Sequence, residues 1–564
     1  MTSVAYDAGR RAWGTVPRVH AWLLSVRPVA LLAPAVVVQW LVTLGIGLDV
    51  RHNGWVYYQG GDQLWYYGSG WLLGKGILAR GLVGPGLPFL DIPFSWFGGP
   101  TLVPALPGIV LFQVLVLAPV ALLCIYGIGD RIGGRVFGYW AALCWIIVPL
   151  IGIKYTDLGY HQIYTEATLP QAYGLTAMAD FPSMVGVIVS VYFTLRILER
   201  TDAVDGIAAG LAAGMAIAIK PSNSVFLLGP ILALAWRRRF IGAAWFAAGI
   251  APAVLVLALW KYRSLGVLPI FSSEGSRRLA LGAGEAVVAF NPLHHYISFD
   301  WHQLDQNLLG IKEHFWSMRV IEWLCFAGLI GLAKRSVDGA LVVGGWFVAF
   351  VVTKGTYTLA GIAGGSIFRI MMPAFPAFVI LLASLVYLLP RGKKGRWPSP
   401  PPLRRSLRPR TRLVLLGAAI VVFAVAPLGV VAAATPLHGP NPQAYEVNLL
   451  IRPVDPSLRL SATTVGDRVL LRWSAEQPAA AKVLYHLWRT GAKDGGAVCT
   501  PVPNASDNCS LTMTDLGARP GHGAVDRPGR GTWTYRLGLA ANWLNSPIQG
   551  DVFAIGPPVT VRVP

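Results

Sequence analysis

Between residues 28 and 434, apolar residues recur in unbroken runs of roughly 15 to 25, the length that a helix needs to cross a hydrocarbon core about 30 Å thick. Short stretches rich in Gly, Pro and charged residues separate the runs. The pattern predicts a polytopic α-helical membrane protein with about 11 transmembrane helices. The predicted spans are 28–48, 102–126, 136–153, 182–198, 204–219, 222–236, 240–260, 319–333, 339–353, 367–389 and 413–434.

The pattern changes after about residue 440. Short runs that alternate apolar and polar residues appear at 469–473, 532–537 and 559–563, and Gly, Pro, Asn and Asp separate them. Alternation with a period of two is typical of half-buried strands. We therefore expect residues 440–564 to form a small antiparallel β-sandwich.

The positions of Lys and Arg predict the orientation of the helices. Several Arg residues precede the first span, which is too long for the apolar core of a signal peptide and is interpreted as an uncleaved anchor. With the amino terminus in the cytoplasm, Arg237-Arg238-Arg239 and the Pro- and Arg-rich linker 391–412 also lie inside, as the positive-inside rule requires. The protein is then a multi-pass protein of the cytoplasmic (inner) membrane, and its C-terminal β-sandwich is extracytoplasmic.

Composition agrees with this topology. Hydrophobic residues make up 54% of the chain and charged residues only 13%, which argues against a string of soluble domains. The formal net charge of +20 would suggest nucleic-acid binding in a soluble chain. Most of the excess falls in the predicted cytoplasmic segments, where orientation and anionic lipid explain it. Nucleic acid is therefore not an expected partner.

The 5 Cys residues are too few for a disulfide scaffold, and no CxxC or Cys/His cluster predicts a zinc site. Cys499 and Cys509 bracket a polar loop in the predicted outer domain and are close enough in the sequence to form a disulfide. Two free thiols are the alternative. Cys124, Cys144 and Cys325 lie in predicted spans and are expected only to pack.

Acidic residues that suggest chemistry lie in the predicted outward loops. The first loop carries Asp62 in an aromatic stretch, then Lys75 and Asp91. The aromatic rings are also explained by an interfacial belt. A carboxylate among them is costly near a membrane unless it has a partner or a function. Asp62 is therefore a candidate functional residue.

Two other outward loops carry candidate residues, namely Asp157, His161, Glu166 and Asp180 before the fourth span and His294 and His295 in the loop 261–318. Asp180 either caps the following helix, with Pro182 in the first turn, or has a function.

Three cations, Lys220, Lys354 and Arg369, are predicted at the outer ends of spans. Each alone is explained by a snorkelling side chain. Gathered around one cavity, they would instead form a site for an anionic head group.

Several short motifs resemble the GT-C superfamily of membrane glycosyltransferases, in the branch related to protein O-mannosyltransferases and aminoarabinose transferases. The motifs are Gly61-Asp62-Gln63, Asp91-Ile-Pro93, Ala179-Asp180-Phe-Pro-Ser183, Ala218-Ile-Lys220-Pro-Ser222 and Phe368-Arg369-Ile-Met-Met-Pro373. The resemblance covers roughly residues 28–390 and makes residues 1–390 the expected transmembrane catalytic domain. Related enzymes often carry an acidic pair where this chain has Asp62-Gln63, a departure that leaves metal use and substrate class open.

The resemblance implies an inverting transfer of a sugar from a polyprenyl-phosphate carrier to an acceptor hydroxyl on the outer face, as in cell-envelope glycan assembly. Such a reaction needs a base, and a carboxylate in a partly dehydrated cavity suits that role, which we assign to Asp62. Arg369, Lys220, Lys354 and Lys75 would stabilise the leaving lipid phosphate. The remaining acidic and His candidates would bind sugar or acceptor, or orient those cations.

Other features of the same chain stay open. No Gly-rich phosphate loop appears, which favours a lipid donor over a nucleotide sugar. A divalent metal shared by Asp62 and Asp91 remains an alternative, and no other cofactor is implied. The β-sandwich resembles a fibronectin type III module and would present an acceptor glycan, lipid or protein, or only stabilise the protein. The rival functions are a transporter or lipid flippase, which usually places ionisable residues near the midplane, and an inactive scaffold.

Overall fold

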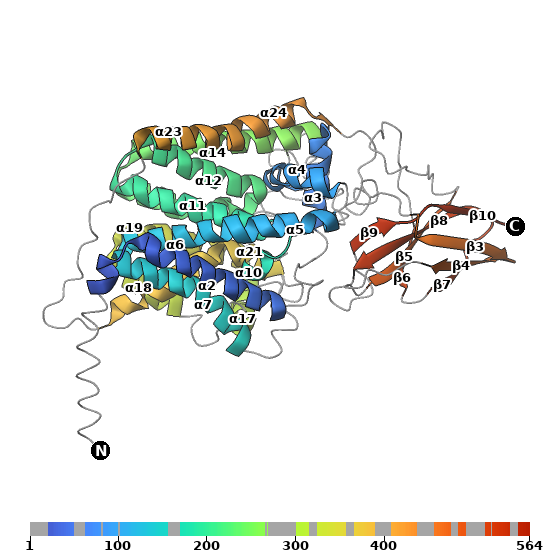
Figure 1. Ribbon diagram of the computed structural model, residues 1–564, viewed down its shortest axis with the longest axis horizontal. Helices are drawn as coiled ribbons and strands as arrows, with labels where there is room; N and C mark the ends of the chain where they lie inside the picture. The colour runs from blue at the N-terminus through green and yellow to red at the C-terminus, as the bar shows by residue number, and fades with distance from the viewer. Residues whose placement is uncertain are drawn as a thin grey trace, which may run out of the picture.

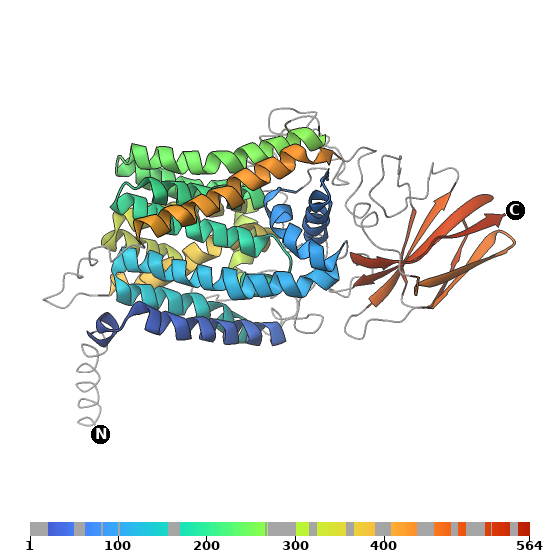
Figure 2. The same ribbon diagram turned by 45° about the horizontal axis from the view of Figure 1, so that its top comes forward.

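The computed structural model describes residues 21–49, 62–79, 83–99, 102–155, 170–265, 268, 300–314, 324–356, 366–389, 408–436, 456–474, 483–491, 514–519, 522–541 and 551–564. Helices lie side by side in one part of the molecule, and most of the strands form a separate part beyond one end of the helices (Figure 1). Figure 2 shows the same two parts after a turn of 45°.

The helical part is built from helices of very different lengths. The α-helices are α2 (Pro28–Asp49), α3 (Asp62–Gly74), α4 (Gly86–Gly98), α5 (Leu102–Phe112), α6 (Ala118–Gly133), α7 (Arg135–Tyr155), α10 (Pro170–Tyr173), α11 (Asp180–Glu199), α12 (Ala203–Ile219), α13 (Leu228–Trp236), α14 (Phe240–Leu265), α17 (Trp301–His314), α18 (Leu324–Arg335), α19 (Val337–Gly339), α20 (Gly345–Gly355), α21 (Ser366–Met371), α22 (Phe375–Ala383), α23 (Pro409–Ile420) and α24 (Ala426–Ala433).

Short segments of different pitch continue several of these helices. The π-helical segments are η1 (Gln113–Leu117), η5 (Ala340–Gly344) and η8 (Val421–Val425), and the 3-10 segments are η2 (Pro221–Leu227), η6 (Met372–Ala374) and η7 (Ser384–Leu388).

In the described part of the chain, seven helices are long and apolar enough to cross a membrane: Pro28–Leu48, Pro104–Gly133, Asp180–Glu199, Phe240–Ser264, Val337–Gly355, Arg369–Leu388 and Pro409–Ala433. Each overlaps a predicted span, which supports a multi-pass helical membrane protein. Three more predicted spans fall on the shorter apolar helices Arg135–Pro149, Ala203–Ile219 and Pro221–Trp236. The span predicted at 319–333 overlaps α18, and its first residues lie outside the described part of the chain. The count of about 11 stays a prediction.

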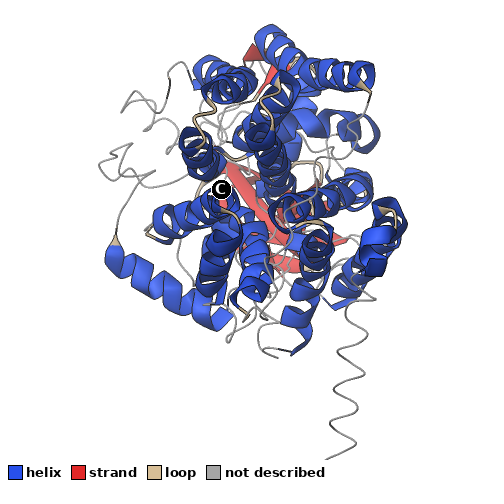
Figure 3. Ribbon diagram, turned by 90° about the vertical axis from the view of Figure 1, so that its left-hand side faces the viewer, coloured by secondary structure: helices blue, strands red, loops and turns tan. Residues whose placement is uncertain are grey.

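Small residues bring the helices close together. Gly210 of α12 faces α14 so closely that an added Cβ would meet the backbone oxygen of Phe246, and Gly249 approaches Gly210 from the other side. Such contacts suit packing inside a bilayer, where close approach of backbones replaces the hydrophobic effect as the source of helix association. In Figure 3, which looks along the helices, they are seen nearly end-on.

The two short helices α3 and α4, which the sequence did not predict, pack on each other beside the end of α12. Gly70 of α3 faces the side chain of Asp91 in α4. Gly84 and Gly86 lie against the backbone of Ala218 and Ile219, where any side chain would collide. The start of α4 is therefore held next to Lys220.

A short pair of parallel strands lies at the same end of the helical part. β1 (Ile77–Leu78) follows α3 and pairs with β2 (Thr435–Pro436), which follows α24. The last helix therefore ends beside α3. This last helix begins with α23, whose first residue is Pro409. Residues 409–412, which the sequence placed in an irregular linker, are therefore helical.

The remaining strands form two antiparallel sheets. One contains β5 (Val483–Gly491), β6 (Thr514–Arg519), β8 (Gly531–Ala541), β9 (Asp551–Ile555) and β10 (Val559–Val563), and the other contains β3 (Arg459–Val465), β4 (Arg468–Ser474) and β7 (Gly523–Asp526). Strands were predicted within β4, β8 and β10, and these predictions are confirmed. Trp473 and Leu471 of one sheet share an apolar cluster with Tyr535 and Leu537 of the other. The fibronectin type III resemblance stays a prediction.

Candidate functional site

Four charged side chains from distant parts of the sequence form one chain of ion pairs. Arg369 Nη2 lies 2.5 Å from Asp62 Oδ2 and 3.4 Å from Asp180 Oδ2. Lys220 Nζ lies 2.6 Å from Asp180 Oδ1. The sequence singled out all four residues separately, and the structure brings them together.

Each of these residues sits at or near a helix end. Asp62 and Asp180 are the first residues of α3 and α11, and Lys220 directly follows α12. Carboxylates are favourable at helix N-termini and cations at C-termini, because the aligned peptide dipoles leave partial charges of opposite sign there. Arg369 lies in α21 at the start of the span that continues to Leu388. The ends of several helices thus form the site.

Asp180 holds the two cations in place. Its side chain is fully buried, and its two oxygens accept from Lys220 and Arg369 respectively. The residue at the N-cap of α11 is Ala179, with no side-chain cap. The capping alternative for Asp180 is therefore wrong, and its predicted functional role stays a prediction.

Asp62 differs from the expectation in one respect. The sequence placed it in a partly dehydrated cavity, but its side chain is 53% exposed. Among the described residues, its ion-pair partner is Arg369, on the accessible side of the ion-pair chain. Asp62 is therefore the carboxylate of this group that an incoming molecule can reach.

Arg369 has capacity for another acceptor. Its side chain is 25% exposed, and its Nε is buried with no hydrogen-bond partner among the described residues. A guanidinium that already bridges two carboxylates keeps this further N–H to offer to an anion. Lys354, at the end of α20, is buried and close enough to Lys220 for their charges to interact.

Gln63 has a structural role that the sequence did not indicate. It is fully buried, and its Oε1 accepts a hydrogen bond from the backbone N–H of Ala177 at 3.1 Å. Gln113 donates to the carbonyl of Thr176 in the same segment. Residue 63, where related enzymes often have an acid, therefore ties the start of α3 to the segment that leads into Asp180.

Tyr66, one turn after Asp62, was assigned only to an aromatic belt. It is buried, and Asp62, Asp180 and Arg369 are all near enough to act on its hydroxyl. Burial and the negative charges of the two carboxylates raise the pKa of Tyr66 far above its usual value. The hydroxyl therefore stays protonated and can donate a hydrogen bond at the site. Spacing of one turn from Asp62 on a helix was the signal that could have identified it.

Asp91 and Lys75 lie apart from the ion-pair chain in the described structure. Lys75 is exposed just beyond α3. Asp91 is buried in α4 against Gly70, and burial raises the pKa of its carboxyl well above the usual range. Among the described residues, Asp62 pairs with Arg369 and not with a group that also contacts Asp91. No group of three His, Cys, Asp or Glu side chains suited to a metal occurs in the part of the chain that the structure describes.

Some predicted residues lie outside the described residues: Asp157, His161, Glu166, His294, His295, Cys499 and Cys509. Their predicted roles, including the disulfide, stay predictions. Cys124 and Cys144 are partly buried in α6 and α7, and Cys325 is buried in α18.

Comparison with known proteins gives weak similarity. No protein-family model matches the chain, and no curated protein matches it significantly. Among solved structures, ArnT from Cupriavidus metallidurans bound to undecaprenyl phosphate has a TM-score of 0.40 and 16% identity, over 64% of this chain and 60% of that chain.

The apo oligosaccharyltransferase of Archaeoglobus fulgidus gives a TM-score of 0.38 and 12% identity, over 72% of this chain and 56% of that chain. The Archaeoglobus fulgidus oligosaccharyltransferase AglB with an inhibitory peptide and a dolichol-phosphate gives 0.36 and 12%, over 73% and 57%. The chain thus spans at most 60% of the length of these proteins. Similarity at this level does not establish a shared fold or activity.

Proposed function

We propose that the chain is an inverting GT-C glycosyltransferase that moves a sugar from a polyprenyl-phosphate carrier to an acceptor hydroxyl on the outer face of the cytoplasmic membrane. The observation that carries the proposal is the ion-pair chain of Asp62, Arg369, Asp180 and Lys220. These residues come from four of the motifs that resemble the superfamily. Asp62 and Arg369 stay partly exposed, so this ion-pair chain is open to a further molecule.

The cations would bind the phosphate of the lipid donor. Lys220 and Arg369 share the buried carboxylate of Asp180, which orients them and leaves the Arg369 Nε for a phosphate oxygen. As the bond between the anomeric carbon and the phosphate oxygen breaks, negative charge grows on that oxygen. Cations that are already in position stabilise this charge with little reorganisation.

Asp62 would act as the general base. When the donor phosphate engages Arg369, this side chain exchanges one carboxylate partner for the phosphate and releases Asp62. Asp62 then takes the proton of the acceptor hydroxyl, whose oxygen attacks the anomeric carbon from the side opposite the leaving phosphate. The products are the glycosylated acceptor and polyprenyl phosphate. General-base catalysis of this kind contributes about 10²- to 10⁴-fold to the rate.

The other parts receive roles on the same proposal. Residues 1–390 form the transmembrane catalytic domain, 391–408 connect it in the cytoplasm to the last helix, which begins at Pro409, and 440–564 form the extracytoplasmic β domain that presents the acceptor or stabilises the protein. Lys354 adds positive charge beside Lys220. The sugar and the acceptor are not specified by the site.

The test compares two Asp→Asn variants that each lose an Asp–Arg ion pair. Asp62→Asn should lower glycosyl transfer from polyprenyl-phosphate sugars in purified protein by about 10²-fold or more. Asp338→Asn, which removes the partner of Arg237 at 2.7 Å elsewhere in the protein, is the matched control and should leave transfer unchanged. Equal transfer by wild type and Asp62→Asn would refute the assignment of the base.

A further inference from the structure

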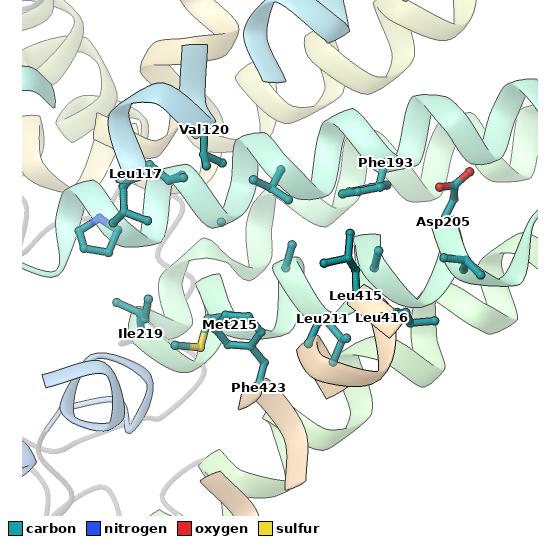
Figure 4. A pocket seen from close by; sticks show the side chains of 18 of the residues that line it. Leu117, Val120, Phe193, Asp205, Leu211, Met215, Ile219, Leu415, Leu416 and Phe423 are labelled. Carbon is teal, nitrogen blue, oxygen red and sulfur yellow. The ribbon is translucent and has the colours of Figure 1, made fainter. Parts of the chain in front are cut away.

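An apolar groove of about 440 Å³ lies lengthwise between α11, α12 and the last helical segments, α23 and η8. Val189 and Phe193 line it from α11, Leu211 and Met215 from α12, and Leu416 and Phe423 from α23 and η8. Figure 4 shows the side chains of Phe193, Leu211, Met215, Leu416 and Phe423 along the groove.

The groove runs from helix ends near the candidate site to the opposite helix ends. At one end it is lined by Pro182 and Ile219, which are close in the sequence to Asp180 and Lys220. At the other end lie Arg196, Asp205 and Arg412. The distance along α11 from Pro182 to Arg196 is about 21 Å at the helical rise per residue. One long chain therefore fits between the two ends.

The charged end of the groove already contains a cluster of ion pairs. Asp205, whose side chain is 1% exposed, pairs with Arg196 at 2.9 Å, Arg200 at 3.2 Å and Arg412 at 3.0 Å. All three guanidinium groups thus already have a carboxylate partner, and Arg412 also pairs with Asp202. The polar end of an occupant is therefore expected at the Asp180 end.

The wall formed by α23 is weakly packed. None of the residues of α23 is buried. Its ionic contacts to the helices across the groove come from Arg412, which lies 2.8 Å from Asp202 and 3.0 Å from Asp205. Within a bilayer, apolar contacts with protein or with lipid tails are similar in energy, so apolar contacts alone hold such a helix weakly. The Arg412 ion pairs are the stronger attachment.

We propose that α23 is a movable wall, held by Arg412, past which the hydrocarbon chain of the lipid-phosphate donor enters the groove sideways from the bilayer. The chain lies lengthwise with its phosphate at Lys220 and Arg369. The occupant follows from the apolar lining between the charged end and the other end, from the length, and from the position of Pro182 and Ile219, which lie close to Asp180 and Lys220 in the sequence. This inference rests on the proposed function and assigns the entry route of its donor.

The first test fills the groove from α23. Ala419 lines the groove, whereas its neighbour Ala418 is exposed on the same helix and does not. The probe is a polyprenyl phosphate with a photoreactive diazirine on its chain, in nanodiscs of defined phospholipid. Ala419→Phe should reduce labelling of α11, α12 and α23 by about ten- to hundredfold, because overpacking excludes the chain. Ala418→Phe should leave labelling unchanged. Equal labelling of the two variants, or equal labelling by a phospholipid with the same diazirine, overturns the inference.

The second test releases the wall. Arg412→Gln leaves Arg196 and Arg200 to neutralise Asp205 and should raise the rate at which bound probe exchanges by about tenfold, whereas Arg412→Lys should restore part of the slow exchange. An unchanged or slower exchange in Arg412→Gln means that α23 is not the wall that moves.

The two proposals fail differently. If Asp62→Asn keeps full transfer while Ala419→Phe loses labelling, the chain site stands and the catalytic assignment fails. If Asp62→Asn loses transfer while labelling is the same in all α23 variants, the catalytic assignment stands and the proposed chain site fails.

Discussion

Replacing Asp180 by Asn tests whether this buried carboxylate holds the site together. Asn keeps the shape and one acceptor oxygen but removes the negative charge that both Lys220 and Arg369 face. The side chains of these cations are only 15% and 25% exposed, so water replaces the lost partner poorly. Removing one partner of a buried ion pair costs about 3–5 kcal/mol. Because Arg369 keeps Asp62 as a partner, we expect Asp180→Asn to lower the free energy of unfolding by about 3 kcal/mol, the lower end of this range.

A double variant separates charge balance from function. Asp180→Asn with Lys220→Met removes one negative and one positive charge, so the unpaired cation disappears together with its partner. Neighbouring sites of this kind show coupling energies of about 0.5–3 kcal/mol in double-mutant cycles. We therefore expect the double variant to recover much of the stability lost in Asp180→Asn. Glycosyl transfer should stay low, because Lys220 is assigned to the donor phosphate.

The assay is thermal unfolding of purified protein in nanodiscs for the wild type, Asp180→Asn, Lys220→Met and the double variant, each followed by a transfer measurement. If Asp180→Asn unfolds at the wild-type temperature, or if the two single changes are strictly additive, the buried pair does not organise the site. If transfer returns together with stability in the double variant, Lys220 has only a structural role.

Three further predictions concern individual residues. Arg369→Lys should raise the KM for the donor by roughly tenfold with a smaller change in kcat, because an ammonium cannot reproduce the planar set of donors that meets both carboxylates and a phosphate; an unchanged donor KM would contradict this. Gln63→Ala should cost about 1–3 kcal/mol, because the N–H of Ala177 loses its acceptor, whereas Gln63→Glu should retain more stability in the same unfolding assay. Burial raises the pKa of Asp91, so the folded protein binds this proton more tightly than the unfolded chain does. The resulting contribution to the free energy of unfolding is fully present below the ordinary Asp pKa near 4 and is lost as pH rises toward the raised value. Asp91→Asn should remove this decline in unfolding temperature against pH, and parallel profiles for both proteins would contradict the assignment.

The charged residues of the site could be found from the sequence because ionisable groups are costly near a membrane. Asp62, Asp180, Lys220 and Arg369 stand out among apolar spans and aromatic loops for this reason. Their meeting point could not be predicted from spacing, since it depends on how α3, α11, α12 and α21 end beside one another.

Neutral residues gave weaker signals. Gln63 looked like a departure from an acidic pair, and only its contact with Ala177 explains its position. The hydroxyl of Tyr66 was hidden among other aromatic residues that suit a membrane interface. The short helices α3 and α4 were missed because their Gly, Pro and polar residues interrupt the apolar pattern.

The helix starting at Pro409 illustrates a different limit. Its first turn contains Pro, Arg and Thr and reads as linker, but Arg412 is drawn into helical structure by Asp202 and Asp205, more than two hundred residues earlier in the sequence. Long-range ion pairs of this kind override a local pattern that favours a loop.

The central claim is that the protein breaks the bond between the sugar and the lipid phosphate, and following the donor itself is its most direct test. Purified protein in nanodiscs is supplied with polyprenyl-phosphate sugars and candidate acceptors, and the lipid products are separated by mass. The proposed transferase predicts that polyprenyl phosphate appears in amounts equal to the glycosylated acceptor in the wild type and is nearly absent in Asp62→Asn. Movement of intact polyprenyl-phosphate sugar across the bilayer, with no polyprenyl phosphate formed by any donor and acceptor pair, would contradict the claim and favour a flippase.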